Sequence, residues 1–184
     1  MSQFVAFDGP RRLVHGSRLD VALALKAAEA ASGPLLAFDL ETGAQVDFDL
    51  RGSRDEIAAR YGESERGPGR PKLGVVAREV TLLPRHWDWL GRQRGGASAA
   101  LRRLIDAARA ADQGATEAAA AKAAAYRLLS AMAGDLPQFE AAARALFADD
   151  VAALRALTAN WPADIVATAL ARLQAGGNKD ALSA

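Results

Sequence analysis

Residues 78–110 read REVTLLPRHWDWLGRQRGGASAALRRLIDAARA and form the most informative stretch of the chain. The residues before Pro84 predict a short strand, which ends there because proline has no N–H to donate to a sheet. The apolar spacing after Pro84 predicts two helices, and the pair Gly95 and Gly96 predicts the turn between them. Arginines occur in every one of these predicted elements. The expectations for function depend on this order of strand, helix, turn and helix.

The basic charge of the chain is concentrated around this stretch. Residues 1–65 hold 7 basic and 11 acidic residues, residues 66–109 hold 10 and 3, and residues 110–184 hold 6 and 8, so the net charges are −4, +7 and −2 within a total of +1. A basic centre between acidic flanks is typical of a protein that binds a polyanion. The alternative is an arginine-rich solvated surface that lies near acidic neighbours of the same chain.

Residues 1–62 alternate between strand and helix patterns and predict an α+β unit. The turn sequence Asp8-Gly9-Pro10 predicts one hairpin, and Glu41-Thr42-Gly43-Ala44 predicts a second. Ser17 and Ser53 are each followed by helical spacing, which predicts a capped helix after each serine. The expected strands are residues 4–7, 12–15, 35–40 and 45–50, and the expected helices are residues 19–31 and a short one through Ile57 and Tyr61.

The other regions follow from composition. Residues 63–77 are rich in glycine, proline and charge and predict a linker or basic arm, whereas residues 78–111 hold the strand-helix-helix pattern. Residues 112–184 are rich in alanine and predict a helical bundle. Its expected helices are residues 116–133, 137–147, a third one capped by Asp149 or Asp150 and running through Leu157, and 164–173. The predicted fold class is therefore α+β, with a two-hairpin unit, a central strand-helix-helix and a helical carboxyl-terminal region.

The central segment resembles the ribbon-helix-helix DNA-binding superfamily. The parts that carry the resemblance are Val80-Thr81-Leu82-Leu83-Pro84, a helix with Trp87 and Leu90, the turn Gly95-Gly96-Ala97-Ser98, and a helix with Leu101, Leu104 and Ile105. The resemblance implies a homodimer in which two strands pair as an antiparallel ribbon that enters the major groove of double-stranded DNA. A lone strand leaves backbone groups unpaired on both edges, which also favours a second copy as partner.

The same resemblance implies which residues contact DNA. Ser98 would cap the second helix and direct its free amides toward a phosphate. The arginines would supply phosphate contacts that weaken as salt increases. The candidate DNA-binding residues are Arg70, Lys72, Arg78, Thr81, Arg85, Ser98, Arg102 and Arg103, with Arg92, Arg94 and Arg109 as further phosphate contacts.

The register of the predicted ribbon stays open. In the register of the superfamily, Arg78, Val80 and Leu82 face the groove, which makes a poor base-reading surface. A shift by one residue buries Val80 and Leu82 and presents Glu79 and Thr81, which is physically better. The further alternative is that the strand and both helices are ordinary parts of a larger α+β core.

Immediately upstream, Gly69-Arg70-Pro71-Lys72 resembles the Gly-Arg-Pro core of an AT-hook. In that motif an extended arginine lies in a narrow minor groove, which attracts it electrostatically. Pro68 stands where the motif usually carries another basic residue. The alternative interpretation is a flexible and soluble linker.

Nearly the whole chain also resembles a family of bacterial proteins classified as a domain of unknown function. The stretches GRPKLGVVAREVTLLPRHWDWL, residues 69–90, and YRLLSAMAGDLPQFEAAARALF, residues 126–147, carry this likeness. It implies a bacterial source and common inheritance of all three segments. It implies no particular activity.

The residue inventory favours a protein that is not an enzyme and needs no cofactor. There is no cysteine, which excludes disulfides, thiol nucleophiles and cysteine-based zinc sites. His15 and His86 lie in different segments and lack a serine or metal-ligand partner at a known spacing. No Walker-type loop or dinucleotide fingerprint occurs. The remaining candidates have structural interpretations, namely Asp149-Asp150 as a cap, Asp47 and Asp49 on the solvent-exposed face of a sheet, and Trp87, Trp89 and Trp161 in the core. The alternative for the three tryptophans is stacking on nucleic-acid bases.

We expect a cytoplasmic protein without a membrane anchor. The amino-terminal sequence MSQFVAFDGPRR lacks the apolar region of a secretory signal, and no uncharged apolar run reaches the roughly 20 residues needed to cross a bilayer. The predicted function is a dimeric DNA-binding regulator of the transcriptional or nucleoid type. The alternative is a protein-interaction module, partner-binding or antitoxin-like, in which the central segment only dimerises or packs.

Overall fold

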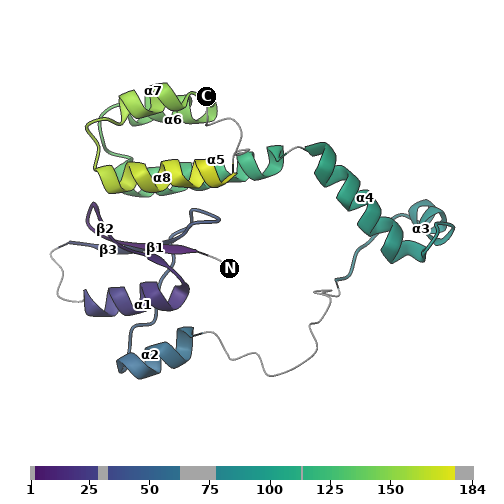
Figure 1. Cartoon of the computed structure of the whole chain (residues 1–184), viewed down its shortest axis with the longest axis horizontal. Coiled ribbons are helices and arrows are strands. Elements are labelled where there is room, and N and C mark those ends of the chain that lie inside the picture. Colours follow the sequence, from purple (N-terminus) through teal and green to yellow (C-terminus); the bar gives the residue numbers. More distant parts are fainter. Residues whose placement is uncertain (1–2, 29–32, 63–77, 113, 177–184) are drawn as a thin grey trace. The chain divides into compact units, whose positions relative to one another are not determined.

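The computed structural model of the chain describes residues 3–28, 33–62, 78–112 and 114–176. The chain forms two compact units, of which the first combines residues 1–63 with residues 114–184 and the second contains residues 64–113. Within the described ranges there are three antiparallel strands and eight helices, so the α+β class is confirmed (Figure 1).

A three-stranded antiparallel sheet with the order β2-β1-β3 lies in the first unit. β1 (Phe4–Asp8) pairs with β2 (Arg11–Gly16) through the turn at Gly9, so the first predicted hairpin is confirmed. β3 (Leu35–Asp39) pairs with the other edge of β1. β1 is therefore the central strand, which explains why four of its five residues are buried.

The second predicted hairpin is confirmed only beside its turn, where the Asp39 N–H donates to the Ala44 carbonyl at 2.9 Å and the Val46 N–H donates to the Ala37 carbonyl at 2.8 Å, and its second strand is wrong. Residues 45–50 form no strand, and a single isolated bridge joins Gln45 to Phe38 of β3. Farther from the turn, the Asp49 N–H donates to the Tyr61 hydroxyl at 2.7 Å. The Tyr61 side chain, and not a paired strand, therefore satisfies this backbone group. The predicted alternation persists in the packing, because the alternate apolar side chains still contact the core through Val46, Phe48 and Leu50.

Two capped helices follow their serines as predicted. α1 (Arg18–Ala27) begins after Ser17, and α2 (Arg54–Tyr61) begins after Ser53. In both, the serine hydroxyl accepts the N–H of the third helical residue, and the carboxylate of that residue accepts the serine N–H. The Ser53 N–H and hydroxyl thereby hold the pKa of Glu56 below its ordinary value, because they favour the ionised carboxylate.

We expect Ser53→Ala to lower the free energy of unfolding by about 1 kcal/mol, because it removes the hydroxyl that caps α2. Urea denaturation followed by circular dichroism measures the difference. Ser98→Ala is the matched control, since Ser98 lies inside α4 (Gly96–Asp112) and is expected to change stability little. Equal losses in the two variants would contradict the capping role of Ser53.

The carboxyl-terminal region is helical, as predicted. Asp150 is the residue that caps the third of its helices, because its carboxylate accepts the Ala153 N–H at 2.8 Å. Asp149 has another role, which is an ion pair with Lys122. The four helices are α5 (Ala115–Ala133), α6 (Phe139–Phe147), α7 (Val151–Leu157) and α8 (Ala163–Gly176).

The sheet and these four helices share one hydrophobic core, although the sequence pattern separated residues 1–62 from residues 112–184. Side chains alternate along β1, so Phe4 and Ala6 face α1 whereas Val5 and Phe7 face the other way. In Figure 1, α1 and α2 lie on one side of the sheet, and α5 and α8 lie on the other. Val5 and Phe7 therefore belong to the same cluster as the buried residues of these later helices, among them Leu128, Leu154 and Ile165.

The second unit contains the two helices predicted for the centre of the chain. α3 (Pro84–Gly91) begins with proline at its first position, where the missing N–H is not needed, and α4 follows it. Gly95 and Gly96 make the turn with φ of +83° and +73°, a region of backbone conformation that favours glycine. The order helix, glycine turn and helix is therefore as predicted.

Candidate nucleic-acid interface

The segment before α3 does not form the predicted strand in the single chain. Residues 78–83 adopt no regular structure, and five of the six are exposed. Val80, which the shifted register was expected to bury, is 51% exposed, and Leu82 is half-buried. The physical reason is that a strand needs a pairing partner, and no described residue supplies one to this segment.

α3 and α4 pack against each other through very little buried surface. Leu90 of α3 and Ala100 of α4 are the only buried residues among residues 78–112. The apolar positions Leu101, Leu104 and Ile105 continue the same stripe along α4, but none of them is buried. One side of α4 is therefore apolar and uncovered by the described part of this unit.

The predicted DNA-contacting residues that the structure describes are all exposed. Arg78 and Thr81 lie in the irregular segment, Arg85 lies in the first turn of α3, and Arg102 and Arg103 lie on α4. No hydrogen bond or ion pair within the described ranges joins the first three to the last two. The structure therefore places these five on one small unit without defining a common contact surface, and Arg70 and Lys72 lie outside the described residues.

The predicted role of Ser98 as a helix cap is wrong. α4 begins at Gly96, so Ser98 is the third residue of the helix and not the residue before it, where a capping side chain lies. Its carbonyl accepts the Nε–H of Arg102 at 3.2 Å, which holds this arginine along the helix surface. Ser98 and Arg102 are therefore brought together, but through the backbone of the serine and not through a hydroxyl cap.

The arginines of the two units differ in their partners. In the first unit, four arginines form ion pairs with described residues, for instance Arg11 with Asp8 at 3.6 Å and Arg51 with Asp49 at 2.9 Å. Arg51 holds the pKa of Asp49 well below its ordinary value by hydrogen bonding and charge. The seven arginines in residues 78–112 form no ion pair with a described residue. They are Arg78, Arg85, Arg92, Arg94, Arg102, Arg103 and Arg109.

Exposed apolar side chains are concentrated in the same unit. Seven large apolar side chains are exposed in the described ranges, and six of them lie in residues 78–112. Trp87 is 44% exposed and Trp89 is 51% exposed, so their predicted place in the core is wrong, whereas Trp161 is buried as predicted. The apolar stripe is visible in the sequence, but the sequence does not show that no described residue covers it. This exposed apolar surface was therefore not predicted.

The described residues offer no metal site with three or more side-chain ligands. They contain no group of three or more histidine, aspartate or glutamate side chains that could hold an ion. His15 lies on the rim of a cavity of about 400 Å³ between the sheet and α8, together with Arg12 and Arg172, and His86 is exposed on α3. None of the helices that the structure describes has both the length and the apolar character needed to cross a bilayer.

Over residues 3–173 the chain matches a family described as an uncharacterized protein conserved in bacteria (DUF2239). The chain belongs to this family. The likeness carried by residues 69–90 and 126–147 is thereby confirmed, and the family match spans segments of both units. No curated protein and no solved structure matches the chain. The ribbon-helix-helix resemblance stays a prediction.

Proposed function

We propose that this DUF2239 member is a dimeric DNA-binding protein that contacts the duplex through α3, α4 and the residues before them. The observation that carries the proposal is the set of seven arginines in residues 78–112, which lack ion pairs with described residues. An arginine surface that serves only for solubility would be expected to engage some nearby carboxylates, as Arg11, Arg51, Arg60 and Arg144 of the first unit do.

The charge balance of the second unit supports the same proposal. Residues 78–112 contain 7 arginines and 4 acidic residues, so their net charge is +3. On α4, Arg102 and Arg109 are seven positions apart and share the side of the helix opposite Leu104. Two copies would double this charge, and phosphate contacts of this type bind duplex with little regard to base sequence.

The segment before α3 supports a role in pairing. Its apolar side chains Val80 and Leu83 are exposed and no described strand pairs with it, and the same segment from a second copy would supply hydrogen-bonding groups to it. Homodimerisation through residues 78–83, with Thr81 on the outer face, is therefore part of the proposal. A major-groove contact of the paired segments would follow from the ribbon-helix-helix resemblance.

The test is binding to a random-sequence duplex as a function of salt concentration. We expect Arg78→Ala combined with Arg102→Ala to weaken binding and to reduce the slope of log K against log salt by about 2 for each protein copy, since each lost phosphate contact removes about 0.9. Fluorescence anisotropy of a labelled duplex measures both quantities.

The matched control removes two arginines of the first unit. Arg11 and Arg144 are exposed and pair with Asp8 and Glu140, so the variant Arg11→Ala with Arg144→Ala loses the same formal charge. Its salt slope is expected to equal that of the wild type. If the control and the test variant bind alike, the surface of the second unit is not the DNA-binding surface.

A protein-interaction module is the second candidate, and the uncovered apolar side chains of the second unit favour it. An interface of this kind excludes water from apolar groups and therefore responds little to salt. Wild-type protein that binds no duplex at low salt, while still self-associating, would support this candidate over DNA binding.

A further inference from the structure

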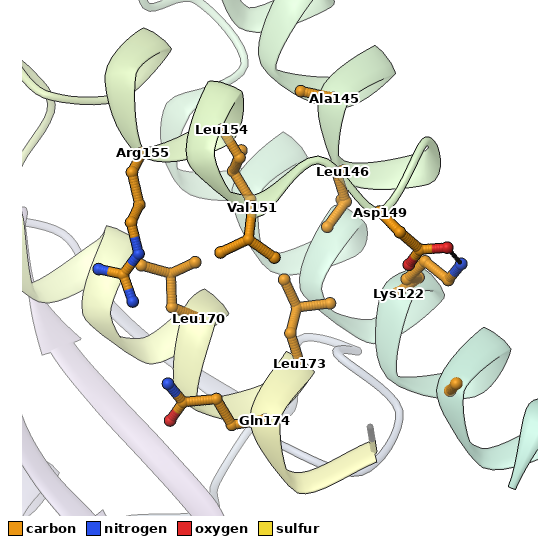
Figure 2. Close-up of a pocket in the computed structure, with 11 residues that line it drawn as sticks. Lys122, Ala145, Leu146, Asp149, Val151, Leu154, Arg155, Leu170, Leu173 and Gln174 are labelled. Atoms are coloured by element: carbon orange, nitrogen blue, oxygen red, sulfur yellow. Dashed lines mark hydrogen bonds and ion pairs between the residues drawn. The ribbon is translucent and has the colours of Figure 1, made fainter. Parts of the chain in front are cut away.

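A cavity of about 420 Å³ lies among the four helices of the first unit and is independent of the proposed DNA-binding surface. Figure 2 shows side chains from α5, α6, α7 and α8 surrounding it. Its middle is apolar and is formed by Leu146, Val151, Leu154, Leu170 and Leu173. A cavity of this size and lining is within the range of small-molecule sites in proteins.

Polar groups lie on two sides of this apolar middle. On one side Lys122 of α5 pairs with Asp149 at 2.8 Å, and on the other side lie Arg155 of α7 and Gln174 of α8 (Figure 2). The cavity thus has an apolar centre with a cation at each end. The two ends are not equivalent, because their partners differ.

The Lys122–Asp149 pair has a structural explanation. It joins α5 to the connection between α6 and α7, and it neutralises the lysine, whose side chain is only 20% exposed. Arg155 has no such partner, since no described residue forms an ion pair with it. Arg155 is therefore the free positive group of the cavity, and the Gln174 amide lies on the same side.

We propose that this cavity binds a small amphipathic monocarboxylate, with the carboxylate at Arg155 and Gln174 and the hydrocarbon body against Val151, Leu170 and Leu173. A carboxylate would form charge-assisted hydrogen bonds with the arginine, whose planar group suits two carboxylate oxygens. An apolar body removes the leucine side chains from water.

The dimensions and charge restrict the ligand further. The volume corresponds to roughly fourteen water molecules, so a ligand of on the order of ten to fifteen non-hydrogen atoms fits. A nucleotide is disfavoured, because the second cation is already neutralised by Asp149 and the middle of the cavity offers no polar partner for a sugar. A purely apolar ligand would give the Arg155 guanidinium and the Gln174 amide no hydrogen-bonding partner.

Octanoate titrated into the full-length protein by calorimetry tests the proposal, with octan-1-ol as the uncharged probe. We expect octanoate to bind with Kd below about 1 mM. Arg155→Gln is expected to weaken octanoate about 10-fold or more and to leave octan-1-ol unchanged, because only the carboxylate meets the arginine. Ala118→Phe, which introduces a large side chain at the wall of the cavity, is expected to weaken both probes.

The matched control is Arg12→Gln, which alters an exposed arginine on the other cavity, between the sheet and α8. It is expected to bind octanoate as the wild type does. The proposal is overturned by the absence of saturable octanoate binding, by equal affinities of Arg155→Gln and wild type, or by a loss in Arg12→Gln instead. Arg155 and Arg12 are both exposed, so this comparison decides the matter even if Ala118→Phe does not fold.

Discussion

Gly43→Ala is expected to lower the free energy of unfolding by about 3–5 kcal/mol, the sum of a backbone penalty and an overlap in a packed interior. Gly43 is buried and has a φ of +70°, a conformation that alanine adopts only at a cost. A Cβ at this position would also overlap the backbone carbonyl of Ala124 in α5. Thermal and urea denaturation followed by circular dichroism measure the loss.

Gly9→Ala separates the two contributions. Gly9 has a φ of +54°, and no atom lies within 4 Å of the place that a Cβ would occupy, so alanine there meets the backbone penalty alone. We expect a loss of about 1–2 kcal/mol for this control. Similar losses for the two variants would show that the Gly43 loop does not lie closely against α5, and the shared core of the sheet and the helices would then be in question.

The loop around Gly43 also shows what local sequence can predict. Glu41-Thr42-Gly43-Ala44 does form a turn, in which the Gly43 N–H donates to the Asp39 carbonyl at 2.8 Å. The turn was predictable because its chemistry is local. The pairing after the turn stops at Val46, beyond which the Asp49 N–H bonds to the Tyr61 hydroxyl. This bond and the close approach of Gly43 to α5 join residues that no local pattern relates.

The helix starts predicted at serines were likewise correct only where local side-chain bonds define them. Ser17 and Ser53 were correctly identified as caps, because each is followed by an acidic residue three positions later. Ser98 lacks such a residue, and the preceding glycines already let the helix start at Gly96. Among the three serines predicted as caps, the position was therefore correct only where the side-chain bonds are reciprocal.

The candidate sites were predictable to different degrees. Arginines are almost always exposed, so the location of Arg102 and Arg103 on the surface of α4 followed from their residue type and the helical pattern. The exposure of Trp87 could not be predicted in this way, because burial of an aromatic side chain depends on which residues pack against it in the folded chain. The cavity with Arg155 is assembled from four separate helices, and no spacing in the sequence indicates it.

Leu104→Asp combined with Ile105→Asp is expected to raise the dissociation constant of the proposed dimer about 100-fold or more. Leu104 is 48% exposed and Ile105 is 55% exposed, and both continue the apolar stripe that starts at the buried Ala100. Burying two carboxylates in an apolar interface costs several kcal/mol, and about 1.4 kcal/mol corresponds to tenfold in affinity. Sedimentation equilibrium over a range of protein concentrations measures the constant.

Phe147→Asp is the matched control, because Phe147 is equally exposed at 54% but lies on α6 in the first unit. This control is expected to self-associate as the wild type does. A monomeric wild type, or equal effects of the two changes, would contradict a dimer formed by the second unit. Circular dichroism of each variant shows whether its helices are retained.

Leu101→Lys combined with Leu104→Lys distinguishes a dimer interface from a DNA-contacting surface, because these two residues are three positions apart on the apolar stripe of α4. If these side chains lay against the duplex, the two added positive charges would strengthen binding and steepen its salt dependence. If they lie between two copies, the same charges repel each other across the interface, and duplex binding falls as the dimer dissociates. We expect the second result, because Arg102 and Arg109 lie on the side of α4 away from Leu104 and the apolar stripe has nothing with which to bind a phosphate.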